Sequence, residues 1–272
     1  MKVMVNGQPG NMASLLASRV VQTEGFELAP YSLTGPEITQ SHVVVAGIDV
    51  KLIPPPDKNL IEYVAFNNKG LLVADFTHPD AVNSNAQLYT SYHVPFVMGT
   101  TGGDRKGLIK TVESSDISAV IATNMAKQVV ALTAMFQYAA EAFPGAFAGF
   151  DFELVESHQS TKVDTSGTMR EMVKYLAQLG LNCSEDDIVK VRDPNAQLAM
   201  GVPESALKGH AFHTYTLTSP DGTVLFKIQH NMLGRNAYAA GALDALKFLE
   251  QKVLSGDKGN VYSMIDVLRA QP

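Results

Sequence analysis

The chain opens with Lys2-Val3-Met4-Val5-Asn6-Gly7-Gln8-Pro9-Gly10-Asn11-Met12-Ala13, an apolar segment followed by a glycine turn. The apolar segment predicts a short buried strand, and apolar residues then recur at helical spacing. A strand, a glycine turn and a helix in this order favour a dinucleotide-binding loop over an ordinary turn, which is the other interpretation. Gly7 would allow the tight turn, Gly10 would let the backbone approach a pyrophosphate, and Ala13 would keep helix and strand close.

Three later predicted strands, at 71–76, 95–98 and 118–122, each end in a polar loop of small residues. The loops are Asp75-Phe76-Thr77-His78-Pro79, Gly99-Thr100-Thr101-Gly102-Gly103 and Thr123-Asn124-Met125-Ala126-Lys127. In an open parallel sheet, ligands bind at the carboxyl ends of the strands, so these loops predict the edge of a cofactor crevice. His78 is interpreted either as a helix cap or as a residue near the nicotinamide.

The predicted cofactor is NADPH or NADH. Ser32 lies where the second strand, predicted at 26–31, should meet the adenosine ribose. The segment 30–35 has neither the acidic residue typical of NAD sites nor the arginine typical of NADP sites, and the missing acid slightly favours NADPH. The predicted cofactor-binding residues are Gly7, Gly10, Asn11, Met12, Ser32, Phe76, Thr77, Gly99, Thr100, Thr101, Asn124 and Met125.

The second half of the chain has a different pattern. Strands are predicted in succession at 150–155, 188–191, 210–218 and 224–231, with one helix at 166–179 between the first two. The predicted fold class is α/β: an N-terminal Rossmann-like doubly wound parallel sheet plus a central α+β domain with a mixed or antiparallel sheet. We expect residues 1–124, completed by 240–272, to bind the dinucleotide. Residues 125–239 would bind substrate and form oligomers through one apolar sheet face.

The segment from Glu156 to Thr168, Glu-Ser-His-Gln-Ser-Thr-Lys-Val-Asp-Thr-Ser-Gly-Thr, predicts a polar crossing from strand to helix. Ser166 and Thr168 could cap the helix, whose free N–H groups favour an anion. His158 could supply a proton near neutral pH, and Lys162 offers a positive charge for a carboxylate. The alternative is a surface histidine and a solvated lysine.

Several neighbours of this segment allow more than one interpretation. Glu156 and Asp164 could pair with Lys162 or orient the histidine. Three histidines on later strands are interpreted as packing or interface groups, namely His210, His213 and His230. No metal is predicted, because no histidine or cysteine spacing typical of a metal site is present.

Composition excludes several classes of function. The net charge is −6 and no cluster of lysines or arginines is present, which argues against a nucleic-acid partner. No apolar run reaches the roughly 18 residues of a membrane span, and the start shows no signal-peptide pattern. The single cysteine, Cys183, excludes an internal disulfide and suits a reducing compartment. The expected partner is therefore a small molecule.

Motifs spread over nearly the whole chain resemble the 4-hydroxy-tetrahydrodipicolinate (dihydrodipicolinate) reductase family, most closely its plant-type branch. They are Gly7-x-x-Gly10-x-Met12, Val97-Met98 with the Gly99–Gly103 loop, Met125-Ala126-Lys127-Gln128-Val129-Val130, Glu156-Ser157-His158-Gln159, Lys162-x-Asp164-x-Ser166-Gly167-Thr168, Arg192-Asp193-Pro194, Gly209-His210-Ala211-Phe212-His213, Leu217–Val224 and Met264-Ile265-Asp266-Val267-Leu268.

The resemblance implies NAD(P)H-dependent reduction of a cyclic dicarboxylate in the diaminopimelate route to lysine. It implies that the catalytic residues are His158, which is the acid, and Lys162, which binds one carboxylate. Gly167 and Thr168 would hold the other carboxylate. Gly7, Gly10 and Met12 would lie on the dinucleotide loop, and Gly99, Thr101 and Asn124 near nicotinamide and substrate. The substrate-binding residues are then Lys162, Ser166, Gly167, Thr168 and Thr101, with a homodimer or homotetramer formed through the central sheet.

The chain departs from the family pattern at several positions. Ala13 replaces a third glycine, Asn11 stands where a basic residue often meets the cofactor phosphate, and Gln159 replaces a second histidine. Two alternatives stay open: a reductase of another cyclic imine or enamine carboxylate, or a non-catalytic assembly factor, which would be expected to lose His158 or Lys162. The expected location is the cytoplasm for a bacterial source and the plastid stroma for a processed plant protein.

Overall fold

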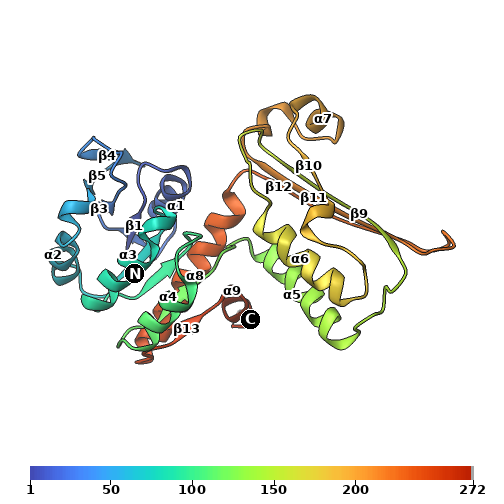
Figure 1. Cartoon of the computed structure of the whole chain (residues 1–272). Helices are drawn as coiled ribbons and strands as arrows, with labels where there is room; N and C mark the ends of the chain where they lie inside the picture. The colour runs from blue at the N-terminus through green and yellow to red at the C-terminus, as the bar shows by residue number, and fades with distance from the viewer. Residues whose placement is uncertain (271–272) are drawn as a thin grey trace. The chain divides into compact units, whose positions relative to one another are not determined.

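The computed structural model describes residues 1–270, which divide into two compact units. Unit 1 comprises residues 1–127 and the segment from Asn236 onward, and unit 2 comprises residues 128–235. Helices and strands occur in both units (Figure 1), so the predicted mixed α/β class is confirmed. Within the described chain, the helices are all too short or too polar to cross a lipid bilayer.

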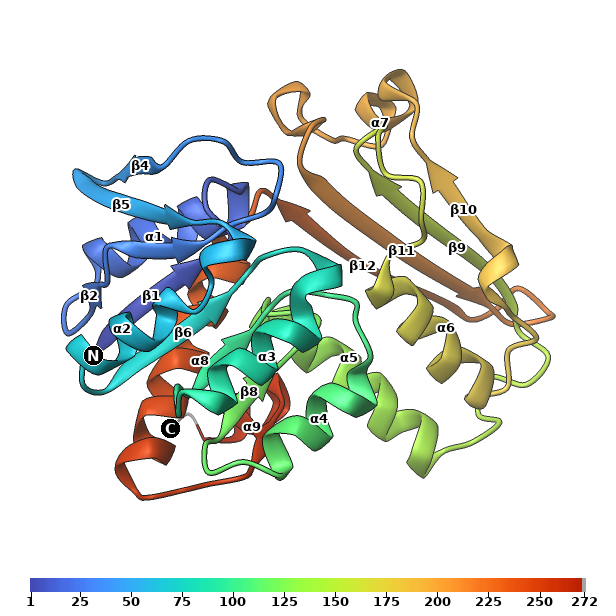
Figure 2. The ribbon, with the colours of Figure 1, turned by 60° about the vertical axis from the view of Figure 1, so that its left-hand side comes forward.

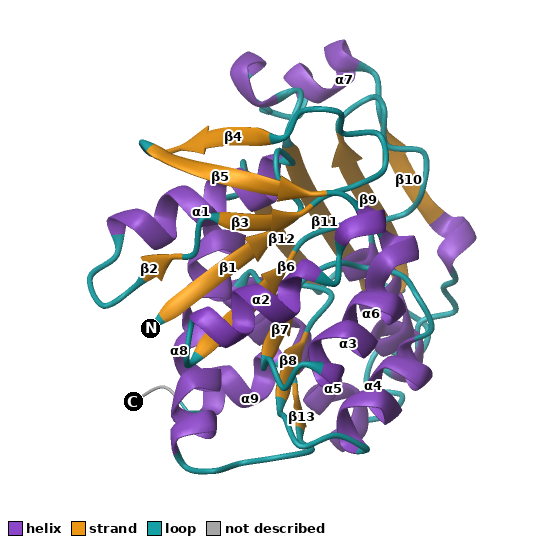
Figure 3. Cartoon of the chain, turned by 90° about the vertical axis from the view of Figure 1, so that its left-hand side faces the viewer, coloured by secondary structure: helices purple, strands orange, loops and turns teal. Residues whose placement is uncertain are grey.

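A parallel sheet of six strands forms the centre of unit 1, in the order β13-β8-β7-β6-β1-β2 (Figure 3). Its strands are β1 (Lys2–Asn6), β2 (Glu27–Leu28), β6 (Leu71–Asp75), β7 (Phe96–Met98), β8 (Ala119–Ile121) and β13 (Val261–Tyr262). Strands β1 and β6 are buried almost throughout, as expected for strands covered on both faces. Helix α1 packs against α8, and α3 packs against α4. The doubly wound Rossmann-like sheet is therefore confirmed.

The helices of unit 1 follow the apolar periodicity of the sequence. They are α1 (Asn11–Gln22), α2 (Leu60–Asn67), α3 (Val82–Ser91), α4 (Arg105–Glu113), α8 (Asn236–Leu254) and α9 (Met264–Arg269), with 3-10 turns at Pro55–Asp57 and Pro79–Ala81. The helix predicted from Pro79 onward thus begins as a 3-10 turn and becomes α-helical at Val82. Asp104 caps α4 by accepting a hydrogen bond from the Lys106 N–H at 3.1 Å.

The prediction of a single second strand at 26–31 is wrong. The segment splits into β2 and β3 (Tyr31–Leu33), because Ala29 N–H makes the last bond to β1, at Val3 O, and Pro30 has no N–H to continue it. Strands β4 (His42–Val45) and β5 (Ile48–Ile53) form an antiparallel hairpin, which joins β3 in a separate three-stranded sheet. In this small sheet, the carbonyl oxygen of Leu33 accepts a hydrogen bond from the Gly7 N–H. The sheet therefore supports the glycine turn.

Unit 2 is a mixed sheet of four strands in the order β10-β9-β11-β12. The strands are β9 (Asp151–His158), β10 (Ile188–Val191), β11 (His210–Thr218) and β12 (Leu225–Leu233), accompanied by α5 (Lys127–Ala142), α6 (Gly167–Gln178), α7 (Pro194–Ala199) and 3-10 turns at Glu185–Asp187 and Glu204–Ala206. Helix α6 lies along one face of the sheet (Figure 2). Its buried residues Met169, Met172 and Leu176 belong to one core cluster with Leu154 and Tyr215. The predicted mixed sheet with a helix on one face is confirmed.

Strand β9 runs three residues beyond its predicted end. Ser157 and His158 pair with Phe212 and Ala211 of β11, so His158 ends the strand and does not lie in the crossing that follows. The sequence suggested a loop here because polar residues are more common in loops. These polar residues are instead buried and hydrogen-bonded within the sheet.

Candidate active site

The turn between β1 and α1 fits the pyrophosphate of a dinucleotide. Gly7 has φ +104°, and a Cβ at this position would lie 2.2 Å from the carbonyl oxygen of Phe76, so only glycine is accommodated. Gly10 donates its N–H to Gly7 O at 2.8 Å and precedes α1. Because α1 starts without a side-chain cap, its first N–H groups and its dipole can bind an anion. Asn11 is exposed at this end, and Met12 is half-buried.

A buried carboxylate organises the loops at the ends of β6 and β7. Asp75 is fully buried and accepts hydrogen bonds from Tyr89 Oη (2.5 Å), Asn85 Nδ2 (3.0 Å), Thr77 Oγ1 (2.7 Å) and Thr100 Oγ1 (2.7 Å). Burial, and then the Asp75 charge, raise the pKa of Tyr89 well above its ordinary value. Asp75 therefore fixes Thr77 and Thr100, two of the predicted cofactor-binding residues, relative to each other.

The remaining cofactor candidates of unit 1 also lie at the carboxyl ends of the strands. A Cβ on Gly99 would lie 2.2 Å from the Phe76 ring, so these two loops are in close contact. Thr101 is exposed, Met125 is buried, and Asn124 Oδ1 accepts the N–H of Ala126 at 2.9 Å. The structure thus brings the predicted loops to one edge of the parallel sheet.

Two predicted residues have a structural role in the described chain. Ser32 is fully buried, and its hydroxyl accepts the Gln8 N–H at 3.2 Å, so it supports the glycine turn from behind. His78 is exposed and caps the 3-10 turn, where its Nδ1 accepts the Asp80 N–H at 3.3 Å. Of the two interpretations of His78, the capping role is the one observed.

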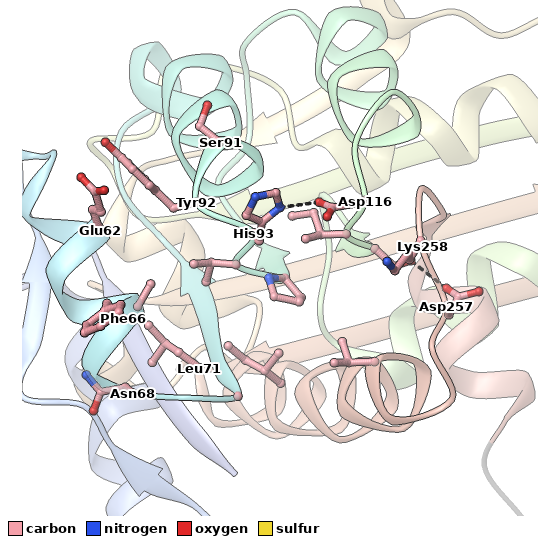
Figure 4. Close-up of a pocket in the computed structure, with 18 of the residues that line it drawn as sticks. Glu62, Phe66, Asn68, Leu71, Ser91, Tyr92, His93, Asp116, Asp257 and Lys258 are labelled. Atoms are coloured by element: carbon pink, nitrogen blue, oxygen red, sulfur yellow. Dashed lines mark hydrogen bonds and ion pairs between the residues drawn. The ribbon is translucent and has the colours of Figure 1, made fainter.

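Two cavities lie at opposite ends of the unit 1 strands. One of about 350 Å³ lies at the carboxyl ends and is lined by Thr34, Glu37, Lys58, Thr77 and His78, among others. The other, of about 720 Å³, lies where β6, β7 and β8 begin, next to the His93–Asp116 ion pair (Figure 4). Coenzymes bind parallel sheets at the carboxyl ends, so the smaller cavity is the one that suits a nucleotide.

In unit 2, a buried ion pair holds the segment after β9. Glu156 is fully buried, pairs with the Arg192 guanidinium, and accepts the Ser166 N–H at 2.9 Å. Arg192 Nε also donates to Lys162 O at 2.8 Å. The pair therefore connects β9, the Lys162 loop and the start of α6. One predicted role of Glu156 was to pair with Lys162. Glu156 instead pairs with Arg192, and Lys162 pairs with Asp164.

A basic side chain and an open helix end lie on the same segment. Lys162 Nζ is 2.7 Å from Asp164 Oδ1 in a partly exposed pair, which contributes little and can be exchanged for a ligand carboxylate. Gly167 begins α6, and a Cβ there would meet nothing within 4 Å. Thr168 follows it and is half-buried. The prediction that the Ser166 side chain caps the helix is wrong. Ser166 occupies the N-cap position, but its side chain makes no capping hydrogen bond.

His158 is nearly buried, with its Nε2 at 3.0 Å from His213 Nε2. Burial lowers the pKa of His158 to about 4; the charge of Glu156 raises it, whereas those of Lys162 and Arg192 lower it further. The imidazole is therefore neutral at pH 7 in the free protein. A bound anion would raise this pKa, because nearby negative charge favours the protonated form.

The sequence did not identify Arg192, His213 or Asp75 as site residues. The alternation along β11 gave a signal for His213, because it lies on the same face as the core residue Tyr215. The sequence also did not indicate that three possible metal ligands lie close together. The ligand atoms of Glu156, His158 and His213 lie within 4.8 Å of one another. The neighbouring charges of Arg192 and Lys162 disfavour a cation at this position.

The fold is a Rossmann-like parallel sheet joined to a second unit with a mixed sheet. The chain belongs to the dihydrodipicolinate reductase family. Residues 1–125 match the family model "Dihydrodipicolinate reductase, N-terminus", and residues 128–268 match "Dihydrodipicolinate reductase, C-terminus". The predicted family is therefore confirmed.

Similar proteins include a rice "Probable 4-hydroxy-tetrahydrodipicolinate reductase 1, chloroplastic", 44% identical over 98% of this chain and 78% of that protein. A "4-hydroxy-tetrahydrodipicolinate reductase 2, chloroplastic" from Arabidopsis thaliana is 45% identical over 98% of this chain and 77% of that protein. A solved dipicolinate-bound dihydrodipicolinate reductase from Paenisporosarcina sp. TG-14 has the same fold, with a TM-score of 0.65 and 20% identity over 98% of both chains. The plant enzymes thus support the plant-type branch.

Replacing Asp75 by Ala should destabilise unit 1. The substitution leaves four side-chain donors and the Thr77 N–H without their acceptor in a buried site, and we expect the free energy of unfolding to fall by about 3 kcal/mol or more. Urea denaturation followed by circular dichroism measures this. Asp49→Ala, at an exposed position of β5, is the matched control and should change stability by less than about 0.5 kcal/mol. Equal stability of the two variants would contradict the organising role of Asp75.

Proposed function

We propose that the chain reduces 4-hydroxy-tetrahydrodipicolinate to tetrahydrodipicolinate with NAD(P)H, in the diaminopimelate pathway of lysine biosynthesis. The main support is the match of both family models over almost all of the chain. The geometry of unit 2 supports a dicarboxylate ligand, since a lysine and an open helix N-terminus flank a buried neutral imidazole. Family and geometry thus favour the same chemistry.

The coenzyme would be held by unit 1. Gly7, Gly10, Asn11 and Met12 would bind the pyrophosphate at the start of α1, where close approach of the backbone is possible. The loops fixed by Asp75, together with Asn124 and Met125, would receive the nicotinamide end. When bound, the nicotinamide supplies a hydride. The protein's contribution is to position the acceptor and to exclude water.

The 350 Å³ cavity supports a site for the adenosine ribose of either coenzyme. Lys58 and Glu37 line it, and both lie outside the segment 30–35, where an acidic residue or an arginine would be expected to meet the ribose. A lysine attracts the 2′-phosphate of NADPH, whereas a glutamate accepts a hydrogen bond from the 2′-hydroxyl of NADH. Opposite charges in one cavity favour use of both coenzymes, with Lys58 as the proposed partner of the phosphate.

The substrate carboxylates would occupy two places in unit 2. Lys162 would exchange Asp164 for one carboxylate, and the N–H groups at Gly167 and Thr168 would bind the other. Two carboxylates close to His158 would raise the pKa of its imidazole, because nearby negative charge favours the protonated form. The ligand itself would thus prepare His158 to protonate the ring carbon that becomes anion-like after hydride transfer, once the 4-hydroxyl has left as water.

The two alternatives differ in outcome. A reductase of another cyclic imine or enamine carboxylate would keep the basic site but fail with the lysine-pathway substrate. A non-catalytic assembly factor would not need His158 or Lys162, and both are present. The observation therefore favours an enzyme.

A coupled assay with freshly generated synthase product, following NADPH and NADH oxidation separately, tests the proposal. Replacing His158 by Gln should lower kcat about a hundredfold or more, with little change in coenzyme affinity. Replacing Lys162 by Met should raise KM for the substrate and lower kcat, whereas Lys174→Met, at an exposed position of α6, should change neither. Oxidation of neither coenzyme by the unaltered protein would reject the proposed activity, and full turnover by His158→Gln would remove this residue from the role of acid.

We also propose a homodimer or homotetramer formed through the unit 2 sheet. Strand β12 is one of the two edge strands of the sheet, and it exposes Leu225 (63%), Phe226 (44%) and Leu233 (54%). An apolar, unpaired edge of this kind is typical of a protein interface. The plant relatives are named as chloroplastic, so the plastid is the compartment we propose if the source is a plant.

Leu225→Glu combined with Phe226→Lys should weaken this assembly, because two charges would have to be buried in an apolar interface. Sedimentation velocity of the unaltered protein should show a dimer or tetramer, and the variant should shift toward the monomer. The control is Tyr63→Glu, an exposed aromatic position on α2. A monomeric unaltered protein, or an unchanged sedimentation coefficient in the double variant, would contradict the proposed interface.

A further inference from the structure

Helix α8 of unit 1 has a glycine in its interior. Gly241 is buried and has helical neighbours on both sides. Glycine is less favourable than alanine inside a helix, because it loses more conformational freedom when the chain becomes ordered. Its φ does not lie in the left-handed region, so the conformation of the backbone does not require glycine either. The glycine is therefore explained by a contact outside the helix.

This contact is with the backbone of Met125, in the loop that follows β8. A Cβ on Gly241 would collide with the carbonyl oxygen of Met125. An alanine would therefore have to displace either the helix or the loop, whereas glycine lets the two backbones approach closely. Met125 is itself buried, so the loop has little room to move away. The position of the loop thus depends on the absence of a side chain at residue 241.

An ion pair holds the same loop at its other end. Lys127 Nζ lies 2.5 Å from Asp244 Oδ2, and the two side chains are only 25% and 24% exposed. Asp244 follows Gly241 by three residues, so both residues lie on the same side of α8. A partly buried pair is screened by salt less than a surface pair. Helix α8 therefore fixes the loop at two points, Met125 and Lys127.

Helix α8 also contacts the helix that follows the glycine turn. Asn236, the first residue of α8, accepts a hydrogen bond from Arg19 Nη2 of α1 at 3.1 Å, and the two helices pack together. Asp75 fixes the loops after β6 and β7 through Thr77 and Thr100. The contacts of α8 have the corresponding role for the loop after β8, and they connect this loop with the helix behind the glycine turn.

We propose that Gly241 and Asp244 are positioning residues for the nicotinamide end of the coenzyme. The proposal rests on the proposed function, in which Asn124 and Met125 receive the nicotinamide. Gly241 acts through the Met125 backbone and Asp244 acts through Lys127, so both residues set the position of the loop without contact with the coenzyme. Two residues of the C-terminal segment thus complete a site whose sequence motif lies at the start of the chain.

The test compares NADPH with 2′-phospho-ADP-ribose, which lacks the nicotinamide, by isothermal titration calorimetry, and NADH with ADP-ribose in the same way. In the unaltered protein, each coenzyme should bind more tightly than its fragment. In Gly241→Ala we expect coenzyme affinity to fall about tenfold or more and fragment affinity to change less than about twofold, because only the nicotinamide end is misplaced. Ala240→Val, at the neighbouring exposed position of α8, is the control and should change neither affinity.

A second variant is needed because Gly241→Ala introduces a backbone collision that can prevent folding. Asp244→Asn removes the charge of the ion pair and keeps the shape of the side chain. It should lower coenzyme affinity by about threefold and leave fragment affinity unchanged, since a partly exposed pair contributes modestly. Glu250→Gln removes another acidic group of α8 and is the matched control, with neither affinity changed.

The ratio of the two affinities separates positioning from support of the fold. Equal losses for coenzyme and fragment would mean that the two residues only stabilise unit 1, and unchanged affinities would mean that α8 does not set the loop. Either result in the variants that fold would overturn the proposal, as would an unaltered protein that binds coenzyme no more tightly than fragment. Affinities that change as expected, without turnover of the lysine-pathway substrate, would reject the proposed activity alone.

Discussion

The buried ion pair between Glu156 and Arg192 is the interaction on which the unit 2 site depends. An unpaired carboxylate at this depth would cost several kcal/mol, so the guanidinium is required once Glu156 is in the sheet. Through one side chain each, the two residues connect β9, the loop that carries Lys162 and the start of α6. The positions of the basic residue, the helix end and His158 thus follow from one buried pair.

A buried carboxylate has the same organising role in unit 1. Asp75 is buried at the end of β6, and the donors around it belong to the loops after β6 and β7 and to α3. In both units, a buried carboxylate at or near the end of a strand cannot remain without partners, and its partners lie in the segments that would meet a ligand. Rigid loops placed by buried charges suit a reaction in which position and charge neutralisation contribute most of the acceleration.

Local signals made a large part of this structure predictable from the sequence. The glycine turn, α1 and the candidate residues from His158 to Thr168 each lie within a dozen residues, where spacing and turn chemistry are informative. Arg192 and His213 were missed because their partners are on other strands, and pairing across a sheet leaves little trace in the sequence. The polar end of β9 resembled a loop for the same reason, since the partners that make its burial possible are distant along the chain.

The central claim is that His158 is neutral in the free protein and becomes protonated when a dicarboxylate binds. The most direct test is a pH titration of ¹⁵N-labelled histidine by NMR, with and without saturating pyridine-2,6-dicarboxylate. We expect the pKa of His158 to lie at about 4 without ligand. With the ligand bound, it should rise by about one unit or more, because two negative charges are placed near the imidazole. An ordinary pKa in the free protein, or a pKa that the bound dicarboxylate leaves unchanged, would contradict the account.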